Sequence, residues 1–320
     1  MRFRTRALGL AAGLTLIAAL TACSGDATAD AQNSENPAAA AEMPEKLVFA
    51  QIPAEDTQTI AEQNEAMYAA ITEATGLEIE VQEVTDYAAV IEALRAGQVQ
   101  LAGMGPFSYM VAKDGGAGVE PLAAVVDAVD ESPGYQSYAI VPQGSDIETL
   151  EDFAGKTICF VDAASTSGYL YPIAGLMELG IDPESDITPV FAGAHDASAL
   201  SVADGTCDAG FAYDAMVDIT LIESGQLEAG ALETVWKSET IAGSPYVVSD
   251  KLPAELIDQL QQVFDETINK PALVEQGFCT TEGDCRMPED AEYGFIDVED
   301  SLYDGVRRVC EITEAAACNV

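Results

Sequence analysis

The stretch TDYAAVIEALRAGQVQLAGMGPFSY, residues 85–109, contains one helix–strand–helix unit of the predicted fold. Asp86 is a good N-cap for a helix that follows it, because its carboxylate can accept a hydrogen bond from a free backbone N–H group. The apolar run VQLAGMG then predicts a strand, and Pro106 stands where the first turn of the next helix is expected. Strand and helix therefore alternate through this part of the chain.

The same alternation extends to both sides of this stretch. Upstream, the sequence predicts a strand over 47–52, a helix over 55–76 and a strand over 77–84. Downstream, strands and helices alternate again from residue 135 to the strand CDAGFAY at 207–213. Consecutive βα units of this kind predict a parallel sheet with helices on its faces.

Two such blocks predict an α/β fold of two lobes, each a mostly parallel sheet flanked by helices, joined by two hinge crossings. We expect the first lobe to be discontinuous, formed by residues 47–136 and 240–320, and the second lobe to span 137–239. The end of the chain carries four cysteines and predicts a loop-rich, disulfide-stapled tail. Ligands of open α/β sheets bind beyond the carboxyl ends of the strands, so the expected site is a cleft that hinge motion would close.

The N-terminal residues 1–22 have the pattern of a signal peptide, with the basic start MRFRTR and a short apolar run. They end at LTAC, Leu20 to Cys23, which resembles the lipobox of bacterial lipoproteins. The resemblance implies cleavage before Cys23 and a lipid anchor on its thiol, and an ordinary secretory signal is the alternative. Residues 23–46 are small and polar, and they predict a flexible tether. We therefore expect an extracytoplasmic protein that contacts the membrane only through this anchor.

Cysteine usage agrees with export. Six cysteines remain after Cys23, an even number that fits an oxidising compartment, and 15 pairings are possible. Spacing favours two local bridges and leaves one long-range bridge, namely Cys279–Cys285, Cys310–Cys318 and Cys159–Cys207. The pairing within the C-terminal tail stays open. No metal site is expected, because the chain has one histidine and no CxxC pair.

The charge balance is strongly acidic, with 55 acidic and 13 basic residues and a formal net charge of −42. This excess argues against nucleic acid and anionic lipid surfaces as partners. It also means that any anionic ligand must be held by local dipoles against a repulsive background.

Hydroxyl and aromatic side chains dominate the loops that are expected at the strand ends. Ser165, Thr166 and Ser167 stand where a strand gives way to a helix, and the free N–H groups and dipole of a helix N-terminus favour an anion. The segment GPFS, which ends at Ser108, could offer a second helix terminus from the other lobe. The alternative is that these serines only cap their helices.

His195 is the only histidine of the chain and lies at a predicted strand end. We expect it to donate a hydrogen bond to an oxyanion, and a structural role is the alternative. A secreted hydrolase that uses Ser167 and His195 with an acid such as Asp214 is an alternative of another class. No G-x-S-x-G motif surrounds the serines, which argues against it.

Several motifs resemble, in order, those of the PhnD-like binding proteins, which serve ABC importers of phosphonate, phosphite and phosphate. These motifs are LVFAQIPAED, TDYAAVIEALRAGQVQLAGMGPFSY, SPGYQSYAIV, STSGYLYP and AGAHDASALSVADGTCDAGFAYD. The resemblance runs from about Leu47 to Val248. It implies a type II periplasmic-binding-protein fold and a non-enzymatic protein that captures a phosphorus oxyanion and delivers it to an ABC permease.

The resemblance also implies ligand-binding residues. The serine–threonine–serine run and the histidine of the family grip the ligand oxygens, and two tyrosines line the ligand. The matching positions here are Ser165, Thr166, Ser167, His195, Tyr87 and Tyr135. Ser108 and Asp214 are further candidates. The site should therefore be a cradle of neutral donors.

The sequence departs from the family where relatives that bind aminoalkylphosphonates place carboxylates. Ala215 and Ser244 stand at these positions, with Asp214 one residue away. A buried ammonium group needs a partner, so we expect a small or uncharged substituent: phosphite, methylphosphonate or phosphate. Asp214 could instead accept a proton from the ligand. We expect no cofactor and a monomeric protein, and the same fold binding another small anion or an organic solute is an alternative.

Overall fold

The computed structural model describes residues 42–55 and 57–319 of the chain. The predicted signal peptide, the predicted lipid anchor at Cys23 and most of the predicted tether lie outside these residues. Within the described part of the chain, no helix is both long and apolar enough to cross a bilayer.

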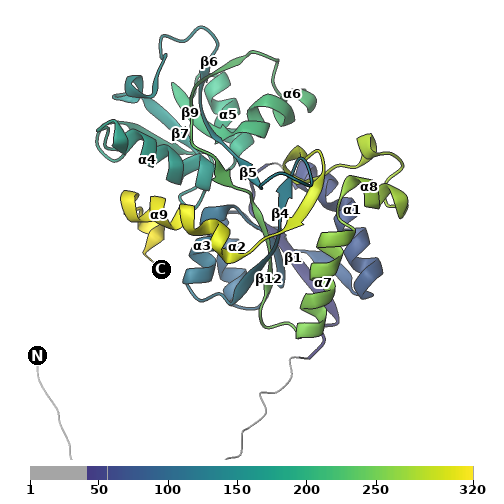
Figure 1. The fold of residues 1–320 in the computed structure, drawn as a ribbon. Helices are drawn as coiled ribbons and strands as arrows, with labels where there is room; N and C mark the ends of the chain where they lie inside the picture. Colours follow the sequence, from purple (N-terminus) through teal and green to yellow (C-terminus); the bar gives the residue numbers. More distant parts are fainter. Residues whose placement is uncertain (1–41, 56, 320) are drawn as a thin grey trace, which may run out of the picture. The chain divides into compact units, whose positions relative to one another are not determined.

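The described residues form two main sheets, each with helices around it (Figure 1). The first sheet has the strand order β13-β4-β12-β3-β1-β2, and the second has the order β10-β6-β9-β7-β8. The strands of the first sheet are β1 (Lys46–Gln51), β2 (Glu78–Val81), β3 (Leu101–Gly103), β4 (Val119–Val126), β12 (Pro245–Ser249) and β13 (Gly294–Asp297). Those of the second are β6 (Ser137–Pro142), β7 (Thr157–Phe160), β8 (Thr188–Phe191), β9 (Ala209–Tyr213) and β10 (Leu232–Lys237). On this basis we propose the lobe boundaries given above.

Both sheets are mixed, which corrects the expectation of mostly parallel sheets. The strands of the consecutive βα units are parallel, with β1 between β2 and β3 and with β7 between β8 and β9. The strands by which the chain leaves and re-enters a lobe are antiparallel to their neighbours, and they include β4, β6, β10 and β12. The strand β4 was not predicted from the sequence.

The helices of the consecutive βα units lie where the sequence predicts them, whereas α6 and α8 were not predicted. They are α1 (Thr57–Thr75), α2 (Tyr87–Arg95), α3 (Pro106–Asp114), α4 (Tyr171–Glu178), α5 (His195–Ala203), α6 (Leu221–Glu223), α7 (Ala254–Glu266), α8 (Lys270–Glu275) and α9 (Asp304–Thr313). Asp86 caps α2 as predicted, since its Oδ1 accepts a hydrogen bond from the backbone N–H of Ala89 at 2.8 Å. Thr149 is the N-cap of the short 3₁₀ helix η1 (Leu150–Phe153).

Side-chain alternation along β1 places helices on both faces of the first sheet (Figure 1). Leu47 and Phe49 are buried in a cluster with residues of α1 and α7, such as Ile71 and Leu260. Ala50 is buried in a second cluster, with residues of α2 and α3. The sheet is thus covered on both faces, and its strand ends are left to form the site.

Two short strands connect the lobes. β5 (Gly134–Tyr135) pairs antiparallel with β11 (Ile241–Ala242), on the two segments where the chain passes between the main sheets. These are the two expected hinge crossings. They place Tyr135 at the entrance to the second sheet.

All three expected disulfides are formed, between Cys159 and Cys207, Cys279 and Cys285, and Cys310 and Cys318. The first closes a loop of 48 residues inside the second lobe, whereas the other two close loops of 6 and 8 residues.

Removing the bridge that closes the longer loop should destabilise the protein more. The chain-entropy model predicts a loss of about 4 kcal/mol for Cys159→Ala with Cys207→Ala and about 2 kcal/mol for Cys279→Ala with Cys285→Ala. Urea unfolding of both double variants measures this. An equal loss in both would contradict the loop-length argument.

Candidate ligand-binding site

The strand-end loops of the two sheets meet across a cleft. The backbone N–H of His195, at the start of α5, donates to the carbonyl of Ala54 in the loop after β1, at 2.9 Å. The backbone N–H of Phe107, at the start of α3, donates to Oγ1 of Thr166 at 2.9 Å. Both bonds join the first lobe to the second, so the structure describes a closed cleft.

Two side-chain bonds add to this closure. The Tyr213 hydroxyl donates to Oε1 of Glu55 at 2.6 Å, and both side chains are buried. The Thr220 hydroxyl, in η3 (Met216–Thr220), donates to Asp290 of η5 (Pro288–Asp290) at 2.5 Å. The C-terminal tail therefore takes part in the cleft.

The serine–threonine–serine run begins the π-helix η2 (Thr166–Leu170), which continues directly into α4. Ser165 is its N-cap, and its Oγ accepts a hydrogen bond from the backbone N–H of Gly168 at 3.1 Å. A Cβ atom at Gly168 would lie 2.3 Å from Cγ2 of Val161 and 2.7 Å from Oγ of Ser165. Only glycine therefore lets the chain approach β7 this closely. π-turns of this kind are often found at functional sites.

The structure gathers the six principal candidates into one cluster. Ser165, Thr166 and Ser167 are buried, and the side chains of Thr166 and Ser167 lie next to the Tyr135 hydroxyl. Burial raises the pKa of Tyr135 well above its usual value, so its hydroxyl keeps its proton at neutral pH. These groups are neutral hydrogen-bond donors.

The bonds of His195 define which ring nitrogen carries the proton. Its Nδ1 accepts a hydrogen bond from the backbone N–H of Tyr213 at 3.3 Å, so the proton of the neutral ring belongs on Nε2. Nε2 lies 3.4 Å from Oγ of Ser165. Burial lowers the pKa of His195 from 6.5 to about 3, which keeps the ring neutral. His195 therefore presents an N–H donor beside Ser165.

This tautomer argues against a hydrolase. In a catalytic triad the histidine accepts the serine proton at Nε2 and donates from Nδ1 to a carboxylate. Here Nδ1 is an acceptor, and Asp214 makes other contacts. His195 is thus arranged as a donor and not as a general base.

Tyr87, the first residue of α2, is buried beside Ser165. Its hydroxyl forms no hydrogen bond of normal geometry, and it is one of three buried side-chain polar atoms without a partner among the described residues. An unpartnered buried hydroxyl is unfavourable. A bound ligand atom would satisfy it.

The two further candidates, Ser108 and Asp214, form hydrogen bonds with backbone groups and not with the side chains of this cluster. The Ser108 hydroxyl donates to the carbonyl of Gly105 in its own helix turn, at 3.0 Å. Asp214 accepts hydrogen bonds from the backbone N–H groups of Gln136 at 2.9 Å and Ala215 at 3.0 Å. Burial raises the pKa of Asp214. These bonds hold Asp214 against the hinge crossing next to Tyr135, and Asp214 also lines the cavity beside the cluster.

Two carboxyl groups of the cleft were not predicted. Glu55 follows β1 in the IPAED loop, which was recognised as a strand-end loop, but no pattern singled out this residue. Glu289 comes from the C-terminal tail, far along the chain from the other residues. It has a left-handed backbone with φ 59°, as has Asp290 with φ 56°, and its side chain lies next to that of Ser244. Burial raises the pKa of Glu289 to about 7.

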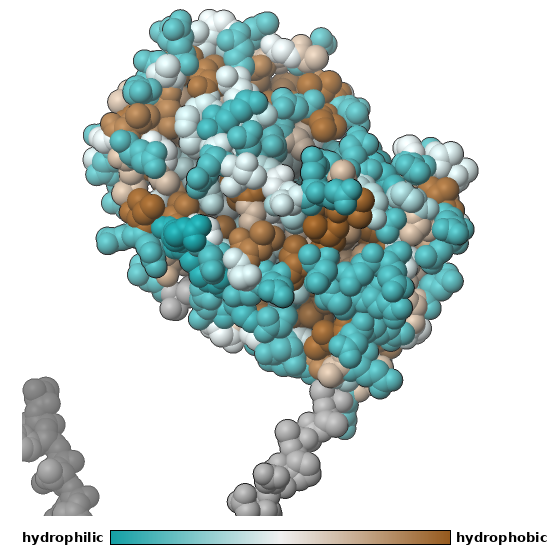
Figure 2. All heavy atoms as spheres, viewed as in Figure 1, coloured by the Kyte–Doolittle hydropathy of each residue, from teal (hydrophilic) through white to brown (hydrophobic). Residues whose placement is uncertain are grey.

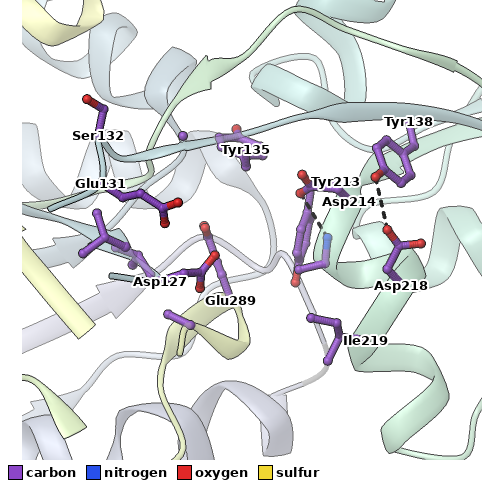
Figure 3. Close-up of a pocket in the computed structure, with 15 residues that line it drawn as sticks. Asp127, Glu131, Ser132, Tyr135, Tyr138, Tyr213, Asp214, Asp218, Ile219 and Glu289 are labelled. Atoms are coloured by element: carbon purple, nitrogen blue, oxygen red, sulfur yellow. Dashed lines mark hydrogen bonds between the residues drawn. The ribbon is translucent and has the colours of Figure 1, made fainter. Parts of the chain in front are cut away.

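A cavity of about 230 Å³ adjoins the cluster, lined by Tyr135 and Tyr213. Figure 3 shows Glu131, Asp127 and Glu289 toward one side of it, and Tyr138 with Asp218 on the other. Its carboxyl groups come from Asp127, Glu131, Asp214, Asp218 and Glu289. No group of three histidine, cysteine or acidic side chains within the described ranges could hold a metal ion. The cavity is therefore acidic, whereas the cluster beside it consists of neutral donors.

The protonation of His195 should be visible by NMR. Because its pKa in the folded state lies near 3, the ring should stay neutral as the pH falls through its usual value of 6.5. The ¹⁵N shifts should place the proton on Nε2. Since only the unfolded chain takes up this proton, folding stability should fall as the pH decreases from 6.5 to about 3. A ring that titrates near its usual pKa would contradict the buried geometry.

Comparison with known proteins agrees with this architecture. The family model described as "ABC transporter, phosphonate, periplasmic substrate-binding protein" matches residues 49–272. The phosphate-import protein PhnD of Mycolicibacterium smegmatis is 44% identical over 307 residues, which cover 93% of either protein. The phosphonates-binding periplasmic protein of Escherichia coli is 30% identical over 233 residues, 72% of this chain and 68% of the relative.

Solved structures show the same fold. A binding protein component of an ABC phosphonate transporter from Pseudomonas aeruginosa superimposes with a TM-score of 0.73 at 25% identity, covering 85% of this chain and 87% of that chain. A protein from Prochlorococcus marinus in complex with methylphosphonate superimposes with a TM-score of 0.72 at 17% identity, covering 85% and 99%. The two-lobed type II periplasmic-binding-protein fold is thereby confirmed. The relatives are substrate-binding components and not enzymes. The chain belongs to the family of phosphonate-type periplasmic substrate-binding proteins of ABC transporters.

Proposed function

We propose that the closed cleft captures a phosphorus oxyanion, either phosphate, phosphite or a phosphonate, and that the protein delivers it to an ABC importer. The observation that carries this proposal is the convergence of neutral donors in the buried cluster. The Tyr87 hydroxyl lacks a partner there, and the Nε2–H of His195 is turned toward Ser165. An oxyanion would receive hydrogen bonds from these groups and from the hydroxyls around them.

Neutral donors are suited to this task in an acidic protein. Figure 2 shows hydrophilic residues over much of one face of the folded part, and the chain as a whole carries a net charge of −42. This background repels an anion at long range, more strongly at low salt. Inside a closed cleft, hydrogen bonds to a charged ligand are stronger because water is excluded. Affinity would therefore come from the cluster and not from the surface.

The relatives support a phosphorus oxyanion and leave its substituent open. One is named for phosphate import, another for binding phosphonates, and a structure of the same fold holds methylphosphonate. A cluster that binds the oxyanion shared by these molecules suits all of them. The neighbouring cavity would then select the substituent.

An amine-bearing phosphonate is a second candidate ligand. Ser244 and Ala215 lack the carboxylates that relatives with such ligands use, which favoured an uncharged substituent. However, Glu289 lies next to Ser244 and lines the acidic cavity beside Tyr135. This carboxyl group could pair with an ammonium group, so the structure removes the reason to disfavour one.

We also propose that the protein acts outside the cytoplasm as a monomer, held at the membrane by a lipid on Cys23 and contacting its permease from there. The signal-peptide and lipobox patterns support this anchor. The three disulfides suit an oxidising compartment.

Calorimetric titration with phosphate, phosphite, methylphosphonate, 2-aminoethylphosphonate and sulfate tests the function. One phosphorus oxyanion should bind tightly, and Ser165→Ala and His195→Ala should each weaken it about 10- to 100-fold, because each removes a hydrogen bond to a charged group. Ser185→Ala, a hydroxyl removed from an exposed site, is the control and should change nothing. No binding of any of the five anions, or binding insensitive to both variants, would contradict the proposal.

Glu289→Gln separates the two candidate substituents. If the ligand carries an amine, the variant should bind 2-aminoethylphosphonate about tenfold or more weakly and methylphosphonate no more weakly, because only the ammonium group loses a charged partner. Glu282→Gln, which removes an exposed carboxylate from the same tail, is the matched control. Equal changes for both ligands would reject the amine-bearing candidate.

A further inference from the structure

Glu55 is a buried carboxyl group at the meeting point of the two lobes. It follows Ala54, whose carbonyl accepts the N–H of His195, and its own Oε1 accepts the Tyr213 hydroxyl at 2.6 Å. The Tyr213 ring packs edge-on against the His195 ring at 4.9 Å. Glu55 is therefore one side chain away from the donor cluster, on the opposite lobe.

Two side chains of the described residues donate hydrogen bonds to Glu55. Besides Tyr213, only the amide of Gln63 on α1 donates to it, at 3.3 Å, among the described residues. The carbonyl oxygen of the same buried Gln63 side chain has no hydrogen-bond partner. The side chains of Glu55, Gln63 and Tyr213 thus offer more hydrogen-bond acceptors than donors, and a proton on Glu55 would supply one more donor.

Three carboxyl groups among the described residues act on Glu55, and Arg286 pairs with one of them, Asp290, at 3.0 Å. Asp290 and Glu289 act on it from η5, and Asp196 acts on it from α5. No lysine or arginine in the described part of the chain forms an ion pair with it. A captured oxyanion would add a further negative charge nearby. An ionised Glu55 is therefore unfavourable in the closed, loaded cleft.

We propose that Glu55 takes up a proton when the cleft closes on its anion, so that ligand capture is coupled to proton uptake. This inference rests on the proposed function. The proton removes a buried negative charge next to the ligand and provides the missing donor. Release follows the reverse course, since opening lets water reach Glu55 and favours loss of the proton.

The pH range of this coupling follows from burial. Desolvation raises the pKa of Glu55 from 4.5 to about 8 in the closed cleft, and the hydrogen bond from Tyr213 opposes this only partly. Opening separates the lobes, exposes the carboxyl group and returns its pKa toward 4.5. Between these two values the closed form binds more protons than the open form. A rise in pH within this range therefore disfavours closure and lowers the affinity for the ligand, by up to about tenfold per pH unit. Above this range the affinity no longer changes through Glu55.

Proton uptake can be measured by titrating inorganic phosphate and methylphosphonate in two buffers of different ionisation enthalpy. Near neutral pH, the wild-type protein should take up about one proton more per bound ligand than Glu55→Gln. For each ligand, the ratio of the dissociation constants of the wild type and Glu55→Gln should also change with pH. The ionisation of the ligand itself cancels in this ratio, so the change reports on Glu55. Glu73→Gln, which removes an exposed carboxylate from α1, should match the wild type.

Tyr213→Phe provides a second variant that keeps the ring and the carboxyl group. Glu55 stays buried in it, so the proton uptake should persist although the affinity falls with the loss of the bond between the lobes. Equal proton uptake by the wild type and Glu55→Gln, with both binding ligand, would overturn this inference and leave the proposed function intact. Loss of uptake in Tyr213→Phe but not in Glu55→Gln would overturn it as well. If neither probe binds, the same titrations are made with phosphite and 2-aminoethylphosphonate, and absence of binding to all four would overturn the inference and the proposed function together.

Discussion

The closed cleft depends on the position of His195. Its backbone N–H bonds to Ala54 across the cleft, its Nδ1 accepts the N–H of Tyr213, and its Nε2 lies beside Ser165. One residue thereby joins the loop after β1, the end of β9 and the start of η2. Since the ring is buried and neutral, its orientation is set by backbone groups and does not change with pH in the physiological range. The donors around it are positioned relative to this ring.

A second constraint is electrostatic. The protein must hold an anion although its chain carries a net charge of −42 and several carboxyl groups line the cavity beside the site. Two consequences are visible in the structure. The oxyanion cluster uses hydroxyls and an imidazole N–H, which bring no compensating charge and need none when water is excluded. Two acids of the cleft, Glu55 and Glu289, have raised pKa values, which lets them become neutral near physiological pH.

The C-terminal tail is part of the site as well as a cover for the lobes. Asp290 bonds to Thr220 of the second lobe, and Glu289 reaches Ser244 through a left-handed backbone. Left-handed conformations at residues other than glycine are unfavourable and often occur at functional sites. The disulfide between Cys279 and Cys285 precedes this turn and restricts the chain that leads to it. In the proposed function, the tail would therefore link selection of the ligand substituent to closure of the cleft.

The amino-acid sequence by itself determined the alternation of strands and helices in the two βα blocks, and it favoured the three disulfide pairs and the candidate donors that the fold brings together. These features depend on local signals: the cap at Asp86, the apolar periods, the cysteine spacing, and the hydroxyl run at Ser165 to Ser167. Only the tertiary structure decided the mixed direction of the sheets and the hinge contact of Asp214. The tertiary structure also brings the carboxyl groups of Glu55 and Glu289 into the cleft. Glu289 is separated from Ser244 by 45 positions along the chain, and no local pattern relates them. The direction of a strand likewise depends on which strand it pairs with after the chain has passed from one sheet to the other. The pKa of a carboxyl group depends on which residues, distant in the sequence, exclude water from it.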